Sequence, residues 1–523
     1  MGSVRQRLES IAIATVLVGL CAWSFAERWD VLASSPFPVG VDGYFYPIQL
    51  RSLLETGSLQ YAASPLAFWV MAPLAAATDP IVGAKLGAAL FGALIAFPAY
   101  GVGVRLGRAR GAGLVAAILA TRSAGSMYLS IEFVKNGLGL TLAMTALWLL
   151  LRALELPTRG RIGGFVVALV LAMLAHKMAA AIVLGIAIPA TLVEVTARGE
   201  LRGRRLLYTI GMLGAGGVAA IIAGVVAPQR FVSPGDLALL GELFTSDAQW
   251  TLPALARDLR ELPLGHEALI GLVLAALAAI ALMGSPVLLQ PGARVLGWCG
   301  IGLAAVIGIP WLDVSDPQGL AFRLRLAAFV PLALCAAIVT GALLALGRRE
   351  LGAALVRRGG LDDAALARHT KRAESAVVAI VLGILALRTP GARTDGRVLA
   401  HPAMIAAAQA MTDRIPAGDT AIIPERHIAF MVAWYTRTRV AIRPDGVPVA
   451  NRWRVLPRHF IGIDSELDRA LLAIRSRTDI PRPLGVHPLH PNGLVIVSEP
   501  TWQALLASLP ENVRSRWARW PTI

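Results

Sequence analysis

The sequence contains few charged residues, and this scarcity excludes a soluble globular protein. Asp, Glu, Lys and Arg together make up 16% of the 523 residues, whereas 56% are hydrophobic. The mean hydropathy is +0.64, and a soluble domain of this size cannot hide so much apolar surface. Successive apolar runs of roughly 16–22 residues have the length that a helix needs to cross about 30 Å of hydrocarbon. The sequence therefore predicts a polytopic membrane protein.

Cysteines and nucleotide-binding motifs are also scarce. The three cysteines (Cys21, Cys299 and Cys335) lie far apart within apolar runs, which is typical of small buried residues. The chain contains no Walker motif, no convincing GxGxxG and no internal repeat. The absence of an inverted repeat disfavours the commonest transporter architectures.

Positively charged residues are abundant, and their positions between the apolar runs indicate that they set the orientation of the protein in the membrane. The formal net charge is +16, which in a soluble protein would suggest nucleic acid as a partner. Here the arginines cluster in short connections between apolar runs, at 5–7, 105–110, 152–161, 197–205 and 347–360. This distribution follows the positive-inside rule and predicts that these connections and the N-terminus are cytoplasmic. Membrane lipids, and no nucleic acid, are therefore the expected partners of this charge.

Eleven membrane spans are expected. They are placed near 11–27, 81–104, 112–128, 137–153, 162–176, 178–196, 207–227, 267–284, 295–312, 326–346 and 375–389. The first is interpreted as an uncleaved span because no small-residue cleavage site follows it. An odd number of spans places the C-terminus outside. The outer connections are then 28–80, 129–136, 176–177, 228–266 and 313–325.

The tail differs in character from the rest of the chain. From about 390 the sequence is polar and punctuated by prolines, with helix-like stretches at 402–413, 464–476 and 500–508 and strand-like runs at 420–423, 439–442 and 494–497. The chain is therefore predicted to be mainly α, with a transmembrane helical domain over 1–389 and a small extracytoplasmic α/β domain over 390–523. Trp434, Tyr435 and Trp453 in this tail are candidates for glycan stacking, although core packing explains them better.

The first outer connection holds the most informative polar residues. Asp42 stands beyond the first span and is followed by Tyr44 and Tyr46. A carboxylate at the membrane edge can act as general base for a hydroxyl, or as half of a metal site. Aromatic rings beside it offer flat faces and hydroxyls to a sugar. The alternative is an ordinary solvated aspartate with tyrosines at the membrane interface.

The order of residues after Asp42 points to a family. "IQLRSLLETG" (48–57) has helical spacing and a glycine stop, and "SPLAFWVMAPLA" (64–75) resumes an apolar segment too short to span. This order, with Tyr61 between the two segments, resembles the first outer loop of the GT-C superfamily of polyprenol-phosphate-sugar-dependent membrane glycosyltransferases, which includes protein mannosyltransferases and aminoarabinose transferases.

The resemblance continues downstream. "SMYLSIEFVKNGLGL" (126–140) resembles the second outer loop of that superfamily and maps its acidic residue onto Glu132. "LAMLAHKMAA" (171–180) is similar to its histidine-bearing turn and maps onto His176, with Lys177 beside it. "FRLRLAAFVPLALC" (322–335) resembles a late span that begins with arginine, here Arg323 and Arg325.

The resemblance implies a function and a set of roles. The protein would transfer a sugar, a hexose or a pentose, from a polyprenyl-phosphate donor to a hydroxyl of a glycan, lipid or protein acceptor at the outer face of the cell (inner) membrane. Asp42 would be the general base. Glu132, the second catalytic candidate, would line the acceptor or donor pocket together with His176, and Tyr44, Tyr46, Tyr61 and Lys177 would also bind the substrates. Arg323 or Arg325 would bind the phosphate, since the planar guanidinium suits phosphate oxygens.

Two departures from the superfamily limit this interpretation. The first loop has no DxD or adjacent acidic pair, which disfavours a bound divalent metal, and no cofactor is otherwise indicated. The chain also lacks the WWDYG-type signature, which argues against transfer to asparagine. "HPLHP" (487–491) has no carboxylate or cysteine at ligand spacing and is interpreted as a proline-rich loop.

Two other functions stay open at this point. A transporter or flippase for a lipid-linked or amphipathic substrate would need a polar path across the bilayer, whereas the charges here gather at one face. A non-catalytic membrane scaffold would tolerate the loss of Asp42.

Overall fold

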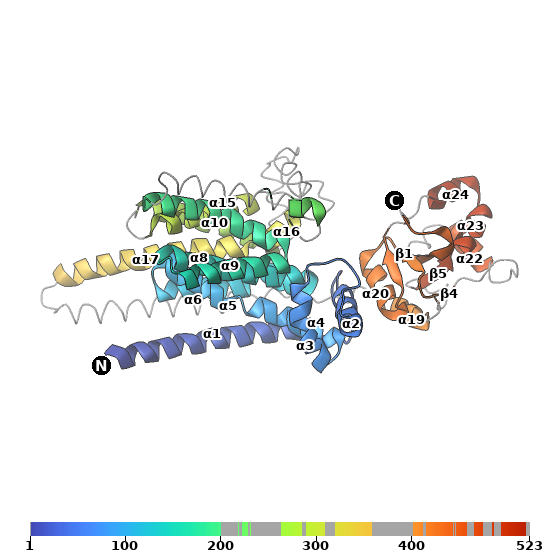
Figure 1. Ribbon diagram of the computed structural model, residues 1–523, viewed down its shortest axis with the longest axis horizontal. Coiled ribbons are helices and arrows are strands. Elements are labelled where there is room, and N and C mark those ends of the chain that lie inside the picture. The colour runs from blue at the N-terminus through green and yellow to red at the C-terminus, as the bar shows by residue number, and fades with distance from the viewer. Residues whose placement is uncertain are drawn as a thin grey trace. The chain divides into compact units, whose positions relative to one another are not determined.

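The computed structural model (Figure 1) describes residues 2–199, 218, 222–227, 231, 263–284, 289–308, 320–357, 401–411, 415–442, 444, 446–457, 465–473, 484–485 and 493–518. The chain divides into two compact units. The membrane unit consists of Met1–Val31, Ala62–Val70 and Leu86–Asp395, and the loop–sheet unit consists of Leu32–Tyr61, Met71–Lys85 and Gly396–Ile523.

The membrane unit is a bundle of helices. These are α1 (Gly2–Ala33), α5 (Ala96–Gly107), α6 (Arg110–Arg122), α7 (Ala124–Glu132), α8 (Val134–Glu155), α9 (Arg159–Ala175), α10 (Lys177–Ala197), α14 (Pro263–Gly284), α15 (Pro291–Gly308), α16 (Leu320–Leu326) and α17 (Phe329–Arg357). α3 (Leu66–Ala77) and α4 (Pro80–Ala93) each run from one unit into the other.

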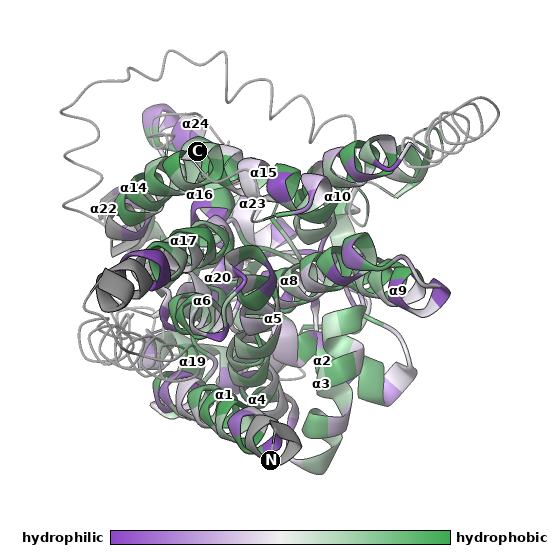
Figure 2. Ribbon diagram, turned by 90° about the vertical axis from the view of Figure 1, so that its left-hand side faces the viewer, coloured by the Kyte–Doolittle hydropathy of each residue, from purple (hydrophilic) through white to green (hydrophobic). Residues whose placement is uncertain are grey.

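Apolar residues cover the outside of these helices as well as the inside. Val167 on α9, Ile280 on α14 and Leu343 on α17 are all exposed, and Figure 2 shows hydrophobic ribbon along much of the bundle. A surface of this kind requires lipid as its solvent. Seven helices among the described residues are long and apolar enough to span a membrane, or up to eight if the bent pair α6–α7 is one span. The predicted integral membrane bundle is thereby confirmed.

The number of eleven spans stays a prediction. The predicted span 375–389 and most of 207–227 lie outside the described residues. One expected boundary is wrong: 129–136 is not a loop, because α7 continues to Glu132 and α8 begins at Val134. Only Phe133, with φ −133° and ψ 59°, interrupts the two helices. Apolar residues flank Glu132 on both sides, so this single acidic residue does not end the apolar run, and the helical segments continue with only this break.

Small residues allow the helices to approach closely. A Cβ atom on Gly341 of α17 would collide with the backbone of Gly107 at the end of α5. Alanines such as Ala112 and Ala337, which are fully buried, line the same contacts. Close packing of small residues is the usual means of joining helices in lipid, where burial of apolar surface gives no net drive.

The loop–sheet unit contains a five-stranded sheet with the order β2–β1–β3–β5–β4. The strands are β1 (Thr420–Ile422), β2 (Arg439–Ala441), β3 (Arg452–Pro457), β4 (Leu484–Gly485) and β5 (Leu494–Ser498). β1 pairs in parallel with β2 and β3, whereas β5 is antiparallel to β3 and β4. Its helices are α2 (Phe45–Thr56), α19 (Pro402–Ala410), α20 (Arg426–Thr436), α22 (Ser465–Ala473), α23 (Glu499–Ala507) and α24 (Glu511–Ala518), with a short 3₁₀ turn η2 at Val449–Asn451.

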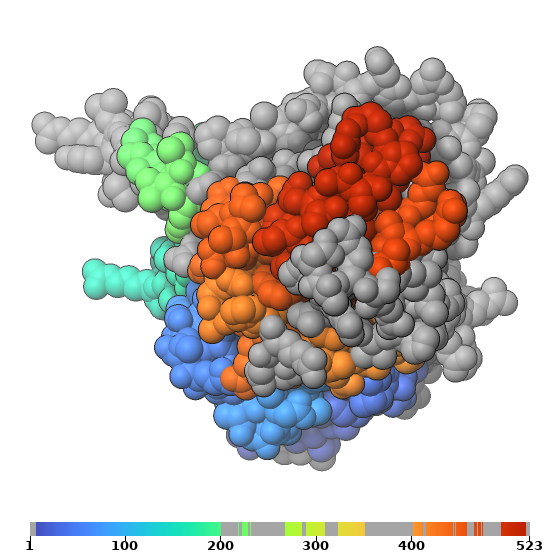
Figure 3. Space-filling model, turned by 90° about the vertical axis from the view of Figure 1, so that its right-hand side faces the viewer, coloured from blue at the N-terminus to red at the C-terminus, as the bar shows by residue number. Residues whose placement is uncertain are grey.

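The alternation of side chains along β5 gives the sheet two apolar faces. Leu494 and Ile496 belong to a core formed with α19 and α20, whereas Val495 and Val497 belong to a core formed with α22, α23 and α24. Figure 3 looks onto this unit, with its C-terminal residues in orange to red. The predicted small α/β fold of the tail is confirmed, while its boundary at 389/390 falls outside the described residues and stays a prediction.

The first outer loop folds together with this sheet. Tyr44 and Ile48 of the α2 region are part of the core that α19 and α20 form on one face of the sheet. The loop and the C-terminal segment therefore share one hydrophobic core, which fixes where the residues around Asp42 lie relative to α20.

Candidate active site

Asp42 lies in a tight turn that opens α2. The backbone N–H of Gly43 donates to the carbonyl of Gly40, and that of Phe45 donates to the carbonyl of Asp42. Gly40 has φ 85°, a left-handed conformation that favours glycine. A Cβ on Gly43 would lie only 2.5 Å from the carbonyl oxygen of Val39. The two glycines thus allow the chain to turn and place Asp42 at the helix N-terminus.

The Asp42 carboxylate is buried and ion-paired. The residue is 7% exposed, and Nε of Arg426, the first residue of α20, lies 2.9 Å from its Oδ1. An isolated carboxylate at this depth would favour its protonated form, and a nearby guanidinium favours the ionised form. The arrangement can therefore supply a carboxylate able to accept a proton.

The tyrosines predicted to bind sugar lie in an aromatic cluster around α2. Tyr44 and Tyr46 are buried, whereas Tyr61 is half-buried. The hydroxyls of Tyr44 and Tyr435 are 3.2 Å apart. The ring of Tyr61 lies 5.6 Å from that of Phe430. Of the three predicted tyrosines, Tyr61 offers the most surface to a ligand.

Burial also sets the ionisation of these phenols. It raises the pKa of Tyr61 to about 12 and raises the pKa of Tyr44, with the hydrogen bond to Tyr435 adding to the effect at Tyr44. Both hydroxyls are therefore neutral at physiological pH, able to donate a hydrogen bond and unable to serve as a base.

Arg51 on α2 forms hydrogen bonds with the C-terminal end of α20. Its Nη1 donates to the carbonyl of Trp434 at 2.8 Å and its Nη2 to that of Ala433 at 3.3 Å. The guanidinium also lies 4.5 Å from the Trp434 ring centre. A cation at the carbonyl end of a helix is stabilising, so Arg51 satisfies groups that would otherwise lack partners. Glu55 and Arg437 form a further ion pair at 3.6 Å between the same two helices.

A second cluster of predicted residues lies within the membrane unit, at the break between α7 and α8. Glu132 ends α7, and the guanidinium of Arg323 on α16 lies 5.0 Å from the ring centre of Phe133. Tyr128 is within electrostatic reach of Glu132, and its ring lies 6.3 Å from that of Phe133. Arg323 therefore lies against the residue that directly follows Glu132.

His176 lies at the junction of α9 and α10. Its Nδ1 accepts a hydrogen bond from the backbone N–H of Met178 at 3.2 Å and so caps α10. A Cβ on Gly139 of α8 would lie 3.0 Å from the Cβ of His176, so the histidine packs against the first turns of α8. Lys177, the first residue of α10, is half-buried beside it.

Arg325 is more deeply placed than Arg323. Arg325 is buried, and Arg323 is half-buried. Both lie on α16, which contacts α7 so closely that a Cβ on Gly125 would collide with the carbonyl oxygen of Leu326. The position of the arginines therefore depends on a small residue at this point of α7.

Glu267 was not anticipated from the sequence and fixes the other end of α7. Its carboxylate accepts hydrogen bonds from the hydroxyl of Ser123 at 2.8 Å and from the backbone N–H groups of Ala124 and Gly125. A carboxylate at a helix N-terminus satisfies donors that have no partner within the helix. The only signal in the sequence is that an acidic residue begins the predicted span 267–284.

The replacement Gly125→Ala is expected to destabilise the membrane unit by displacing α16, since the added methyl meets a backbone carbonyl that cannot move aside. Overpacking of this kind costs about 1–3 kcal/mol. Gly137→Ala is the matched control, because the nearest atom to its Cβ is 3.8 Å away. Thermal unfolding of both purified variants checks the difference. A lower Tm for Gly137→Ala than for Gly125→Ala would contradict the close approach of α7 and α16.

Arg28 is a second residue that the sequence did not single out. It is 1% exposed, and its guanidinium donates to the hydroxyls of Ser24, Ser126 and Ser130 and to the carbonyls of Ser24 and Thr121. Neutral oxygens thus satisfy all its donors, and Arg28 links α1 to α6 and α7. Its role is to hold the helices that carry Glu132.

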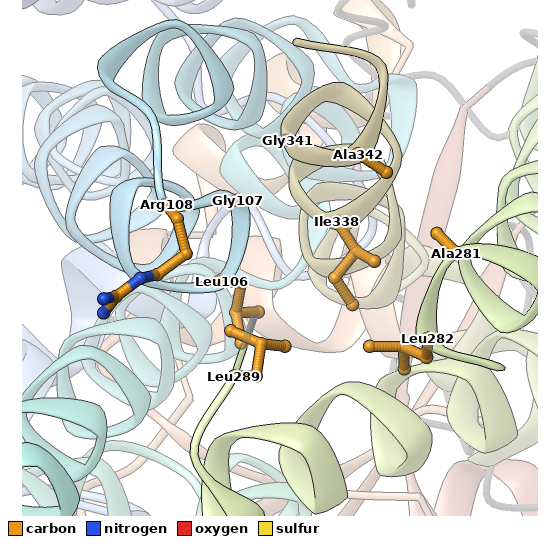
Figure 4. Close-up of a pocket in the computed structure, with 9 residues that line it drawn as sticks. All are labelled: Leu106, Gly107, Arg108, Ala281, Leu282, Leu289, Ile338, Gly341 and Ala342. Carbon is orange, nitrogen blue, oxygen red and sulfur yellow. The ribbon is translucent and has the colours of Figure 1, made fainter. Parts of the chain in front are cut away.

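Two further observations bear on ligands. Among the residues that the structure describes, no group of three or more His, Cys, Asp or Glu side chains is placed to hold a metal ion. A small pocket of about 20 Å³ lies between α5, α14 and α17. Its lining residues are Leu106, Gly107, Arg108, Ala281, Leu282, Leu289, Ile338, Gly341 and Ala342. Figure 4 shows the Arg108 guanidinium directed away from the apolar side chains, and the pocket contains none of the predicted site residues.

Comparison with known proteins supports the fold. No protein-family model matches the chain, and no curated protein matches its sequence. The crystal structure of ArnT from Cupriavidus metallidurans bound to undecaprenyl phosphate superposes with a TM-score of 0.54 and 14% sequence identity, over 93% of this chain and 98% of that chain. The chain has the ArnT fold. The apo structure of the same ArnT gives a TM-score of 0.50 at 15% identity, over 96% and 100% of the two chains. The expected fold, a helical membrane bundle with a C-terminal sheet, is thus confirmed.

Proposed function

We propose that the protein is a membrane glycosyltransferase that moves a sugar from a polyprenyl-phosphate donor to an acceptor hydroxyl at the outer face of the membrane. The observation that carries this proposal is the fold shared over nearly the whole chain with ArnT, one of whose structures holds undecaprenyl phosphate. The buried, ion-paired Asp42 in the first loop supports it, since the reaction needs a base.

In the proposed reaction, Asp42 accepts the proton of the acceptor and Arg323 stabilises the departing phosphate. The acceptor oxygen attacks the anomeric carbon of the sugar, its proton passes to Asp42, and the bond from that carbon to the phosphate oxygen breaks. The polyprenyl phosphate leaves with the electron pair. Arg323 stabilises the charge that develops on the phosphate, which is the main electrostatic contribution expected of such a site. Glu132 and His176 are proposed to contact the sugar or the acceptor.

We assign the C-terminal segment to the extracytoplasmic side of the inner membrane and the N-terminus to the cytoplasm. The arginine-rich connections support this orientation. The shared core of the first loop and the C-terminal sheet agrees with it, because both must then lie on the same side. Trp434, Tyr435 and Trp453 contact Arg51, Tyr44 and Asp419 respectively, which supports core packing over glycan stacking.

The test is sugar transfer by the purified full-length protein in detergent. A panel of radiolabelled polyprenyl-phosphate sugars supplies the donor, and membrane extract from the source cells supplies the acceptor. Transfer of label by the wild type is the expected result. Binding of a donor without transfer to any acceptor favours the scaffold, and movement of intact lipid-linked sugar across proteoliposomes favours the flippase.

The replacement Arg323→Gln is expected to raise the KM for the donor by about 10- to 100-fold, because a charge-assisted hydrogen bond to phosphate is lost. Arg349→Gln, at an exposed position on α17, removes the same charge elsewhere and serves as the control. Titration of the labelled donor against initial rate measures both. An unchanged KM in Arg323→Gln would move the phosphate-binding role to Arg325 or Lys177.

A further inference from the structure

The ion pair between Asp42 and Arg426 joins the first outer loop to the C-terminal segment. The Asp42 side chain is 9% exposed and that of Arg426 is 46% exposed, so the guanidinium lies at the rim and the carboxylate beneath it. An ion pair between two exposed side chains usually contributes little to the stability of a protein. This pair differs because its anionic partner is buried and because other contacts fix both backbones.

The Arg426 side chain is held at a second point. Its guanidinium lies 5.6 Å from the ring centre of Phe430, four residues further along α20. Phe430 in turn packs against Phe45, with ring centres 5.1 Å apart, and against Tyr61. The aromatic cluster therefore positions Arg426 over the turn that carries Asp42.

The helices that carry the pair are fastened at their other ends. Arg51 bonds to the carbonyls of Ala433 and Trp434, and Glu55 pairs with Arg437. The residues on either side of Arg426, Glu425 and His427, contact each other, with Nε2 of His427 3.3 Å from Oε2 of Glu425. The geometry of Asp42 and Arg426 is thus set from several sides, as in a preorganised site.

We propose that Arg426 is the positioning residue for Asp42. The C-terminal segment thereby contributes a residue to the site that the first outer loop forms around Asp42. The guanidinium, whose Nε lies 2.9 Å from Oδ1 of Asp42, fixes the direction in which the carboxylate faces the acceptor. This inference rests on the proposed function, since it assumes that Asp42 is the general base. It assigns to the sheet unit a part in catalysis in addition to any contact with the acceptor.

The test uses the full-length protein in detergent, with the variants Arg426→Gln and Arg426→Lys. The kcat of transfer is expected to fall by about 10- to 100-fold in Arg426→Gln, as is typical when a residue that orients a catalytic group is lost. The donor KM is expected to stay unchanged. Arg426→Lys, which keeps the charge, is expected to recover part of the loss. A purely structural role would lower the amount of folded protein and leave kcat intact.

A second measurement does not depend on activity. Labelling of Asp42 with a water-soluble carbodiimide and an amine, followed by peptide mass spectrometry, reports how well the carboxyl is protected. The rate is expected to rise several-fold in Arg426→Gln. It should stay at the wild-type value in the control Arg469→Gln, which removes an exposed arginine on α22 of the same unit.

The outcomes separate this inference from the proposed function. Wild-type protein that transfers sugar, with equal kcat for Arg426→Gln, overturns the role of Arg426 and leaves the proposed function standing. Unchanged labelling in Arg426→Gln overturns the ion pair itself. Wild-type protein that transfers no sugar from any donor overturns the proposed function and, with it, the catalytic meaning of the pair.

Discussion

The replacement Asp42→Asn is expected to lower the kcat of sugar transfer by about 10²- to 10⁴-fold, the usual contribution of a general base. The amide has the same shape and still offers an oxygen to Arg426, so the turn and α2 should keep their structure. It cannot take up the proton of the acceptor hydroxyl at neutral pH. The initial rate of label transfer at saturating donor measures the loss, and the donor KM should be unchanged.

Asp79→Asn is the matched control for this variant. Asp79 belongs to the same unit, and its carboxylate caps α4 by accepting from the N–H groups of Ile81 and Val82 at 2.7 and 3.0 Å. Asparagine caps a helix about as well as aspartate, so the rate should equal that of the wild type. Equal rates for Asp42→Asn and wild type would show that another group accepts the proton, and Glu132 would be the next residue to replace.

The sequence was a good guide to the fold because the two signals that define it are strong. Apolar runs of membrane length predicted the helices of the bundle, and α8 over Val134–Glu155 contains the expected span 137–153. Short strand-like runs of apolar residues predicted β1, β2 and β5. β3 was not predicted, because Arg452 and Arg454 interrupt its run of apolar residues. Only the structure shows that Arg454 is paired with Glu499. α20 was not among the helix-like stretches predicted from the sequence.

In each contact of the candidate site, the sequence pointed to one of the two interacting residues and not to its partner. Asp42 stood out as an acidic residue at a membrane edge, but nothing near it in sequence indicates Arg426, which lies in the tail. Arg28 was hidden for a related reason, since its partners Ser126 and Ser130 belong to a distant helix. The local sequence pattern identifies candidate catalytic residues such as Asp42. The residues that contact them come from helices and strands far away in the sequence. Which of these elements pack together depends on the whole hydrophobic core.

The C-terminal sheet depends on a buried ion pair. Arg454 of β3 and Glu499 of α23 have 6% and 2% of their side chains exposed, and two nitrogens of the guanidinium contact the carboxylate at 2.8 and 3.1 Å. Burial alone would raise the pKa of Glu499, but hydrogen bonds from Arg454 and Gln503 outweigh it and hold the pKa below its ordinary value. The stabilisation is therefore complete above the unfolded pKa, near 4.5, and is lost as the pH falls through the lower folded pKa.

The replacement Glu499→Gln is expected to destabilise the sheet by about 3–5 kcal/mol, because it leaves the charge of Arg454 buried without a counter-ion. Hydrogen exchange of the backbone amides of Val495 and Val497, measured by mass spectrometry on the full-length protein, reports this loss as faster exchange. The double variant Arg454→Met/Glu499→Leu separates charge from packing, since apolar residues of similar size often replace a buried pair without loss. Exchange that returns to the wild-type rate in the double variant would show that the cost of Glu499→Gln is the unpaired arginine. Exchange that stays fast would show instead that the hydrogen bonds of this pair hold α23 against β3.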